Sequence, residues 1–292
     1  MNTKAQLKKF EESLDIIRSI TRAFEHTATQ KMVVNRNEIE RLKVHLNEIK
    51  QTYMSTKVSI RRKNVPKDTL VNSTVRVPTR SKVVILISSE PEYYSNLLDR
   101  MASEFISEVK SGADGIVIGK PGRDEVDKRI GKKINYSFFD FDDNKPDWPA
   151  VNKVSQILLQ YAQIVVIFCQ FRSILAQDVI KEDIAGKVTE DVDVEAKKYL
   201  IKPDSKTALE YLEHQLITGN FLQKLYENGL AKSAIRVKIL EIGEIAERLA
   251  VAMDMFERYK RKVNREINNR KLINLYSGSS VWHEQSIFTV YR

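Results

Sequence analysis

No glycine and no proline interrupts the first 65 residues of the chain, from Met1 to Val65. Because glycine and proline are the residues that most disfavour a helix interior, an uninterrupted stretch of this length predicts a single long helix. A helix of roughly 55 residues extends about 80 Å at 1.5 Å per residue, which is longer than a small domain is wide. The N-terminal region is therefore expected to form a rod.

Apolar residues along this stretch recur in alternating steps of three and four, the pattern of a coiled-coil seam. The first part of the seam is Leu7, Phe10, Leu14, Ile17, Thr21, Phe24 and Ala28. After Ala28 the row shifts, as expected where supercoiling relaxes, and continues through Met32, Asn35, Ile39, Leu42, Leu46, Ile49 and Tyr53. The pattern predicts that the helix packs against a second long helix.

A matching element is predicted at the other end, where no proline follows Pro203 and no glycine lies between Gly243 and Gly278. Apolar residues at helical spacing there are Ile235, Ile239, Ile242, Ile245, Leu249, Met253, Phe256, Tyr259, Val263, Ile267, Leu272 and Leu275. We expect the terminal helices to pair as a long antiparallel coiled coil. The dipeptides Gly219-Asn220 and Asn228-Gly229 are typical breakers, and they predict a separate shorter helix over residues 207–226.

Between the long helices the pattern changes to strands that alternate with amphipathic segments. Strands are expected at residues 82–88, 115–119, 134–141 and 163–171, and helices at 92–109, 123–129 and 148–161. This order predicts an α/β domain with a mostly parallel, Rossmann-like sheet, in which residues 173–185 pair back as an antiparallel hairpin and residues 198–201 add an edge strand. The basic stretch 55–81, with Pro66 and Pro78, is expected to be a linker.

The expected division of the chain follows from these elements. It consists of an N-terminal coiled-coil helix at residues 1–58 and an α/β domain with its linker at 59–205. The C-terminal coiled-coil helices follow at residues 206–280, and a tail at 281–292. The single cysteine, Cys169, follows an apolar run, which predicts a buried side chain and not a disulfide. The longest apolar runs are well below the ~18 residues of a membrane span, and neither a signal peptide nor a transmembrane helix is expected.

A search for catalytic or cofactor chemistry finds none. The loop Ser88-Ser89-Glu90-Pro91-Glu92 lacks glycine and carries two carboxylates where a phosphate would bind, which disfavours a dinucleotide. No metal site is expected from the scattered histidines, and the acidic stretch lacks the glycine and distal glutamate of a calcium loop. These residues are His26, His45, His214 and His283, and Asp140, Asp142, Asp143 and Asp147. With no nucleophile beside a base, we expect no catalytic residue, no cofactor and no metal.

The net charge of +9 favours an acidic partner, and basic residues crowd the predicted C-terminal helix. They are Arg258, Lys260, Arg261, Lys262, Arg265, Arg270 and Lys271. A solvated helical face is one interpretation and a contact with a negative protein surface is another. Nucleic acid is a third, although the aromatic interleaving and the known motifs of such proteins are missing.

Four groups of residues resemble one family, the gamma subunit of F-type ATP synthases. The first group is an Ile-Thr-basic-Ala pattern in the opening helix, and the second is a strand that leads into a Pro-Asp turn. The third group is a glutamate, small residues and an arginine at the start of the last helix, and the fourth is the end of the chain's helical part, which finishes in Ser-Gly. These residues are Ile16, Ile17, Ile20, Thr21, Arg22, Ala23, Phe24 and Lys31; 199–204; 208–226 with Glu227, Ala231, Ser233, Ala234 and Arg236; and 268–278. The chain departs from the family at the Gly-Leu-Cys-Gly-type loop, which is 89–94 here, at Arg270 and Lys271, and in the extension 281–292.

The resemblance implies a non-catalytic central-stalk rotor subunit, peripheral at the cytoplasmic face of a membrane. It implies as partners a ring of nucleotide-binding and catalytic ATPase subunits, a smaller epsilon-like stalk subunit and a membrane rotor ring. It assigns ring contacts to Arg18, Arg22, Lys31, Arg258, Arg261, Arg265 and Arg270, and an apolar shaft tip to Leu272, Ile273, Leu275 and Tyr276. The alternatives are the shaft of a paralogous rotary ATPase, a nucleic-acid-binding coiled coil, and an α/β enzyme with a coiled-coil stalk.

Overall fold

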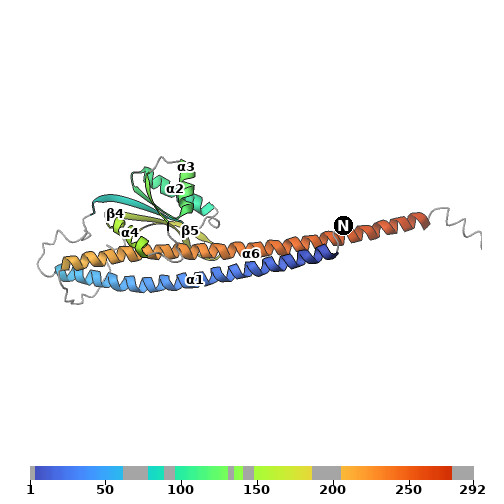
Figure 1. The fold of residues 1–292 in the computed structure, drawn as a ribbon, viewed down its shortest axis with the longest axis horizontal. Helices are drawn as coiled ribbons and strands as arrows, with labels where there is room; N and C mark the ends of the chain where they lie inside the picture. Colours follow the sequence, from blue (N-terminus) through green and yellow to red (C-terminus); the bar gives the residue numbers. More distant parts are fainter. Residues whose placement is uncertain are drawn as a thin grey trace, which may run out of the picture. The chain divides into compact units, whose positions relative to one another are not determined.

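The structure, a computed structural model, describes residues 4–61, 78–88, 96–130, 135–140, 148–185 and 205–277. It contains two compact units, Met1–Leu240 and Glu241–Arg292, which are described separately below. Unit 1 holds an α/β layer, one long helix and the part of a second long helix that ends at Leu240 (Figure 1). The described part of unit 2 is helical throughout.

The first long helix, α1, runs from Lys4 to Arg61 and confirms the helix predicted from the absence of glycine and proline. It extends into the segment that we expected to be a linker, so that prediction is wrong for residues 55–61. The reason is packing, because Ser55 and Thr56 are buried next to Tyr53 and Met54. The remainder of the expected linker, at residues 62–77, lies outside the described residues.

The sheet has five strands in the order β3-β2-β1-β4-β5. Their bounds are Arg80–Ile87 for β1, Asp114–Ile118 for β2, Tyr136–Phe139 for β3, Tyr161–Phe171 for β4 and Gln177–Asp183 for β5. The pairs β1–β2, β1–β4 and β2–β3 are parallel, and β4–β5 is antiparallel. The mostly parallel sheet and the antiparallel hairpin are thus confirmed, whereas the expected edge strand at residues 198–201 lies outside the described residues.

The sheet is covered on both faces, which explains why β1 is a continuous apolar run. Val84 and Leu86 pack with α2 (Asn96–Lys110) and α3 (Lys120–Ile130). Val83, Ile85 and Ile87 pack on the other face with α4 (Trp148–Leu158), α1 and α6 (Ser205–Ser277). Figure 1 shows α2 and α3 on the side of the sheet away from the two long helices.

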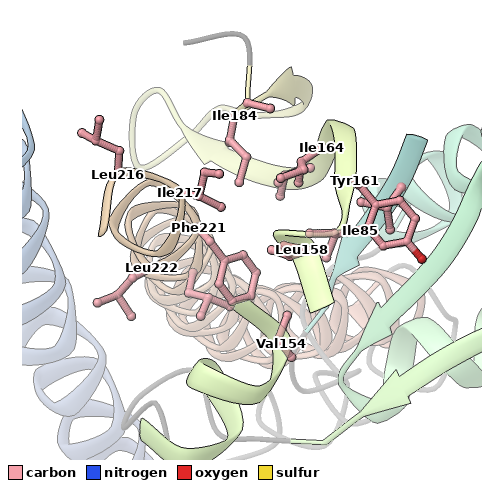
Figure 2. Packing of buried hydrophobic residues seen from close by; sticks show 14 of the residues in the cluster. Ile85, Val154, Leu158, Tyr161, Ile164, Ile184, Leu216, Ile217, Phe221 and Leu222 are labelled. Carbon is pink, nitrogen blue, oxygen red and sulfur yellow. The ribbon is translucent and has the colours of Figure 1, made fainter. Parts of the chain in front are cut away.

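One face of α6 is part of the core beneath the sheet. Ile217 and Phe221 point from the helix toward the side chains of Val154, Leu158 and Ile164 (Figure 2). Leu216 and Leu222 project from the other side of the helix and belong to the same core cluster as Leu46, Tyr53 and Met54 of α1. This part of α6 therefore packs against both the sheet and α1.

The continuity of α6 over 73 residues contradicts the predicted separate helix at residues 207–226. Gly219 lies inside α6, where a Cβ would come within 2.6 Å of Leu46 Cδ2, so glycine allows the close approach of α1. Asn228 is also tied to tertiary structure, because its Oδ1 accepts a hydrogen bond of 3.1 Å from the backbone N–H of Cys169. These contacts outweigh the helix penalty of about 1 kcal/mol for glycine.

Among the predicted seam residues of α1 whose burial is described, full burial begins at Ala28. Ala28, Asn35, Ile39, Leu46 and Tyr53 are buried in unit 1. Nearer the N-terminus, Ile17 and Phe24 are each 53% exposed. Supercoiled pairing along the full length of the helices, the Rossmann-like character of the sheet and the four-part domain division therefore stay predictions.

Candidate functional site

The candidate surface of unit 2 is the part of α6 beyond Glu241. Apolar side chains on this helix are at least two-fifths exposed and follow helical spacing: Ile242, Ile245, Leu249, Met253, Phe256, Tyr259 and Ile267. Contiguous exposed apolar side chains of this size are typical of a surface that a partner covers.

Three of the four predicted ring-contact arginines of unit 2 occupy a different face of the same helix. Arg258, Arg261 and Arg265 recur in steps of three and four, and at roughly 100° per residue they lie opposite the apolar row. Arg270 does not share this face, because at the same angle per residue it lies within about 20° of Tyr259 in the apolar row. The helix therefore has an apolar face and a basic face, each able to contact a different surface.

Two of these arginines make ion pairs within the helix. Arg258 lies 2.5 Å from Asp254 and Arg261 lies 3.2 Å from Glu257. Both pairs are more than half exposed, and exposed pairs of this kind contribute at most about 1 kcal/mol. A partner carboxylate could therefore compete for either arginine at small cost.

The predicted shaft tip is exposed along its whole length. Leu272, Ile273, Leu275 and Tyr276 are between 50% and 70% exposed at the end of α6. The structure brings these four side chains together on the last turns of one helix.

The predicted basic residues of α1 belong to unit 1. Arg18 and Arg22 are one turn apart, so they share a face, and Arg22 is exposed. Lys31 is half-buried and lies on another side of the helix. Arg18 and Arg22 therefore lie on one face of α1, and Lys31 lies on another.

The carboxyl edge of the parallel sheet, where an α/β enzyme would bind a ligand, is filled by Ser88. Its Oγ accepts a hydrogen bond of 2.8 Å from the backbone N–H of Gly122 near the start of α3, and donates one of 2.8 Å to the carbonyl of Ile118. Gly119 has a φ of 89°, and a Cβ there would lie 1.8 Å from the Ser88 carbonyl oxygen. The protein's own serine thus occupies the position beside the helix start where a phosphate would need to approach.

Cys169 is a core residue, as predicted. Burial is the main reason why the pKa of its thiol is raised to about 12, so the thiolate is scarce at neutral pH. Among the described residues, no cluster of histidine, cysteine and acidic side chains could hold a metal ion. His26, His45 and His214 lie on α1 and α6, Asp140 pairs with Lys120, and the other predicted acidic-loop residues and His283 lie outside the described residues.

A buried ionic cluster joins the sheet to α6, and the sequence patterns did not predict it. Lys224 Nζ lies 2.9 Å from Glu227 and 3.2 Å from Glu182 of β5, and 4.9 Å from the centre of the Phe168 ring. The lysine side chain is only 6% exposed. Its sequence signal is slight: a lysine among apolar neighbours, with a glutamate three residues later.

A second cluster lies where α2 meets the sheet. Glu108 accepts hydrogen bonds of 2.5 Å from Lys181 and from Lys82, and these two lysines lower the pKa of its carboxyl. The cluster joins α2 to strands β1 and β5.

Among the described residues, no helix combines the length and apolar character that crossing a membrane requires.

Comparison with known proteins identifies one family. A family model described as ATP synthase matches residues 4–266. A chain from the Tetrahymena thermophila mitochondrial ATP synthase central stalk and c-ring shares 12% identity, covers 77% of this chain and 99% of its own length, and has a TM-score of 0.52. A chain from the Euglena gracilis mitochondrial ATP synthase rotor shares 14% identity over 82% of this chain and 98% of its own, with a TM-score of 0.44. A search of curated proteins finds no match.

Proposed function

We propose that this chain, which belongs to the ATP synthase gamma-subunit family and is a central-stalk subunit of a rotary ATP synthase, transmits torque through its long helices. The observation that carries the proposal is the family match over residues 4–266, in a chain whose α6 continues for 73 residues without a break. An unbroken helix resists bending and twisting better than jointed segments. The chain would thus link rotation to a ring of nucleotide-binding and catalytic subunits.

The proposed mechanism is conformational coupling, with no chemical step on this chain. A stalk that offers different contacts at different angles stabilises one state of each ring subunit over another, and ATP synthesis or hydrolysis is then linked to rotation. Two features support a non-catalytic role. The side chain of Ser88 fills the carboxyl edge of the sheet beside the start of α3, and the thiol of Cys169 is buried.

We propose that α1 and α6 pair as an antiparallel coiled coil. In unit 1 their contacts run in opposite directions, since Leu46 faces Gly219, whereas the earlier Ile39 shares a cleft with the later Leu230. Continuing this register pairs Ala28 with Val237, and both side chains are buried.

A disulfide tests that register. In a Cys169→Ala background, cysteines placed at Ala28 and Val237 should form a bond on mild oxidation, visible as a gel shift. Cysteines at Ala28 and Ala231 form the matched control, because Ala231 is buried on the same helix almost two turns earlier. Equal cross-linking of both pairs would rule out a fixed register.

We further propose that the arginine face of α6 contacts the ring. Its members are Arg258, Arg261 and Arg265. The other proposed contacts are Arg270, which lies on the side of the apolar row, and Arg18, Arg22 and Lys31 of α1. The apolar tip of Leu272, Ile273, Leu275 and Tyr276 would turn within the ring with few directional contacts. The support is the separation of the basic face of α6 from its apolar row.

The α/β layer is the proposed foot of the stalk. We propose that it binds a smaller epsilon-like subunit and a membrane rotor ring, which would place the chain peripherally at the cytoplasmic face of a membrane. The Tetrahymena structure described above contains a c-ring, which supports this part of the proposal by analogy.

The test is charge reversal in the reconstituted complex. Arg265→Glu with Arg270→Glu should lower ATP turnover coupled to rotation, because two favourable contacts become repulsive. Arg41→Glu is the control, since Arg41 is an exposed arginine on α1 outside the proposed contact. Unchanged assembly and turnover in the double variant would count heavily against the ring contact.

A further inference from the structure

The last turns of α6 carry apolar side chains on one side of the helix. Leu275 and Tyr276 lie three and four residues after Leu272, so the three side chains share a face, which we call the tip face. Leu272 is 50% exposed and Leu275 is 70% exposed. Large apolar side chains that are grouped and exposed in this way are typical of a surface that another segment covers.

The sequence that follows α6 is rich in large apolar residues. They make up half of residues 281–292 and are Val281, Trp282, Ile287, Phe288, Val290 and Tyr291. Leaving such side chains in water is unfavourable, and covering apolar surface removes part of that cost. The nearest exposed apolar surface along the chain is the tip face.

The tip face is within reach of this segment. Gly278 directly follows Ser277, the last residue of α6, and glycine at this position allows a chain to leave a helix and reverse its direction. The turn of helix from Leu272 to Tyr276 covers only about 6 Å. A segment as long as 281–292 spans about 18 Å even with the short rise of a helix, so its length is sufficient in any conformation.

Charge favours the same contact. Lys271 is exposed one turn before Leu275, at the border of the tip face. Glu284 is the only acidic residue in the segment 281–292. A chain that reverses at Gly278 runs antiparallel to α6, which brings Glu284, six residues after the glycine, back toward Lys271, seven residues before it. Apolar contact would supply most of the stabilisation, and the opposite charges would favour one alignment.

We propose that residues 281–292 fold back on the tip face and cap the end of α6. Proximity, length and charge select this occupant, which belongs to the chain itself. The inference goes beyond the proposed function, because it concerns a contact of the chain with itself: the segment turns with the shaft and forms the outer surface of its tip. The cap leaves the apolar row from Ile242 to Ile267 to a surface outside unit 2.

Tryptophan fluorescence of the isolated full chain tests the cap. The chain has two tryptophans, so Trp148→Phe leaves Trp282 as the only reporter. In this background Trp282 should be shielded from the quencher acrylamide. Leu275→Asp should lower the equilibrium constant for closing the cap about tenfold, because a covered leucine is lost, and quenching of Trp282 should rise accordingly. Leu249→Asp is the matched control, since Leu249 is 60% exposed on the same helix, far before the tip, and it should leave quenching unchanged.

A charge swap tests the alignment. Lys271→Glu places a carboxylate near Glu284, so it should increase the quenching of Trp282. Adding Glu284→Lys restores opposite charges at the two positions and should return the quenching to that of the parent chain. An equal increase in the single and double variants would show that the segment is not aligned in this way and would overturn the proposed contact.

Several other outcomes would overturn the inference. They are a Trp282 that is quenched as strongly in the folded chain as in urea, equal quenching in Leu275→Asp and Leu249→Asp, shielding that grows with protein concentration, and shielding that arises only in the assembled complex. The last two results would mean that a second copy or a ring subunit covers the tip face. Circular dichroism of each variant shows whether increased quenching reflects lost helix. If the complex couples ATP turnover to rotation while Trp282 is unshielded, the cap is wrong and the proposed function stands.

Discussion

Lys224 gives the sharpest test of how the sheet is held to α6. The lysine is 5% exposed and its ammonium is shared between two carboxylates, one on its own helix and one on β5. Removing one partner of a buried ion pair typically costs about 3–5 kcal/mol, because the remaining charge is left without compensation. Lys224→Met keeps much of the side-chain volume but leaves Glu182 and Glu227 facing each other, so we expect a loss in this range.

A variant series separates the charge effect from packing. Adding Glu182→Gln and Glu227→Gln to Lys224→Met removes the unpaired charges, and this triple variant should recover most of the lost stability. Urea unfolding followed by circular dichroism gives the free energies. Hydrogen exchange of the β5 amides reports whether the edge strand loosens first.

Salt provides a second criterion. Because the cluster is buried, raising the salt concentration should barely change the difference between Lys224→Met and the parent chain. The reasoning is refuted if the single variant loses less than about 1 kcal/mol, since that value is within reach of an exposed pair. It is also refuted if the triple variant is as unstable as the single one, because the loss would then come from packing.

Three further predictions concern single positions. Gly243→Ala should stabilise α6 by about 0.5–1 kcal/mol in urea unfolding, since a Cβ there meets nothing within 4 Å. Gly219→Ala should be destabilising, because its Cβ would collide with the buried side chain of Leu46. Equal effects of the two variants would refute the packing argument. Because the pKa of Glu108 is lowered in the folded protein, its contribution to stability is present above the ordinary carboxyl pKa and is lost as the pH falls through the lowered pKa. Glu108→Gln should therefore make the melting temperature fall less steeply as the solution is acidified. Cys169 should resist a thiol-reactive dye at pH 8 until urea unfolds the chain, and rapid labelling of the native protein would contradict its burial.

The elements that could be predicted from sequence are those that local pattern determines. The absence of glycine and proline was sufficient for α1, and the continuous apolar run at Val83–Ile87 was sufficient for a strand buried on both faces. The break predicted near Gly219 was wrong because glycine has two uses. It weakens a helix, but it also allows a second helix to approach, and only the position of Leu46 distinguishes these cases.

The features of the candidate site also divide into those that local pattern predicts and those that depend on tertiary contacts. The separation of the apolar row from the arginine face in unit 2 follows from helical spacing alone, whereas the exposure of the row does not, because the same spacing predicts a packed coiled coil. The Lys224 cluster and the cleft lined by Arg36 and Phe171 could not be predicted, because each joins residues far apart in the chain, such as Glu182 with Lys224. Their spacing in the sequence carries no periodic signal.

The two halves of α6 differ in what can stabilise them. Between Leu209 and Val237 the helix buries apolar side chains within unit 1. Beyond Glu241 the large apolar side chains with described burial are more than a third exposed, apart from Val263, which is partly buried. Since most helical stability in proteins comes from packing and not from propensity, the second half depends on surfaces outside unit 2. A stalk whose distal helix needs a partner to cover it is coupled to that partner, because changing the covered surface changes the stability of the helix itself.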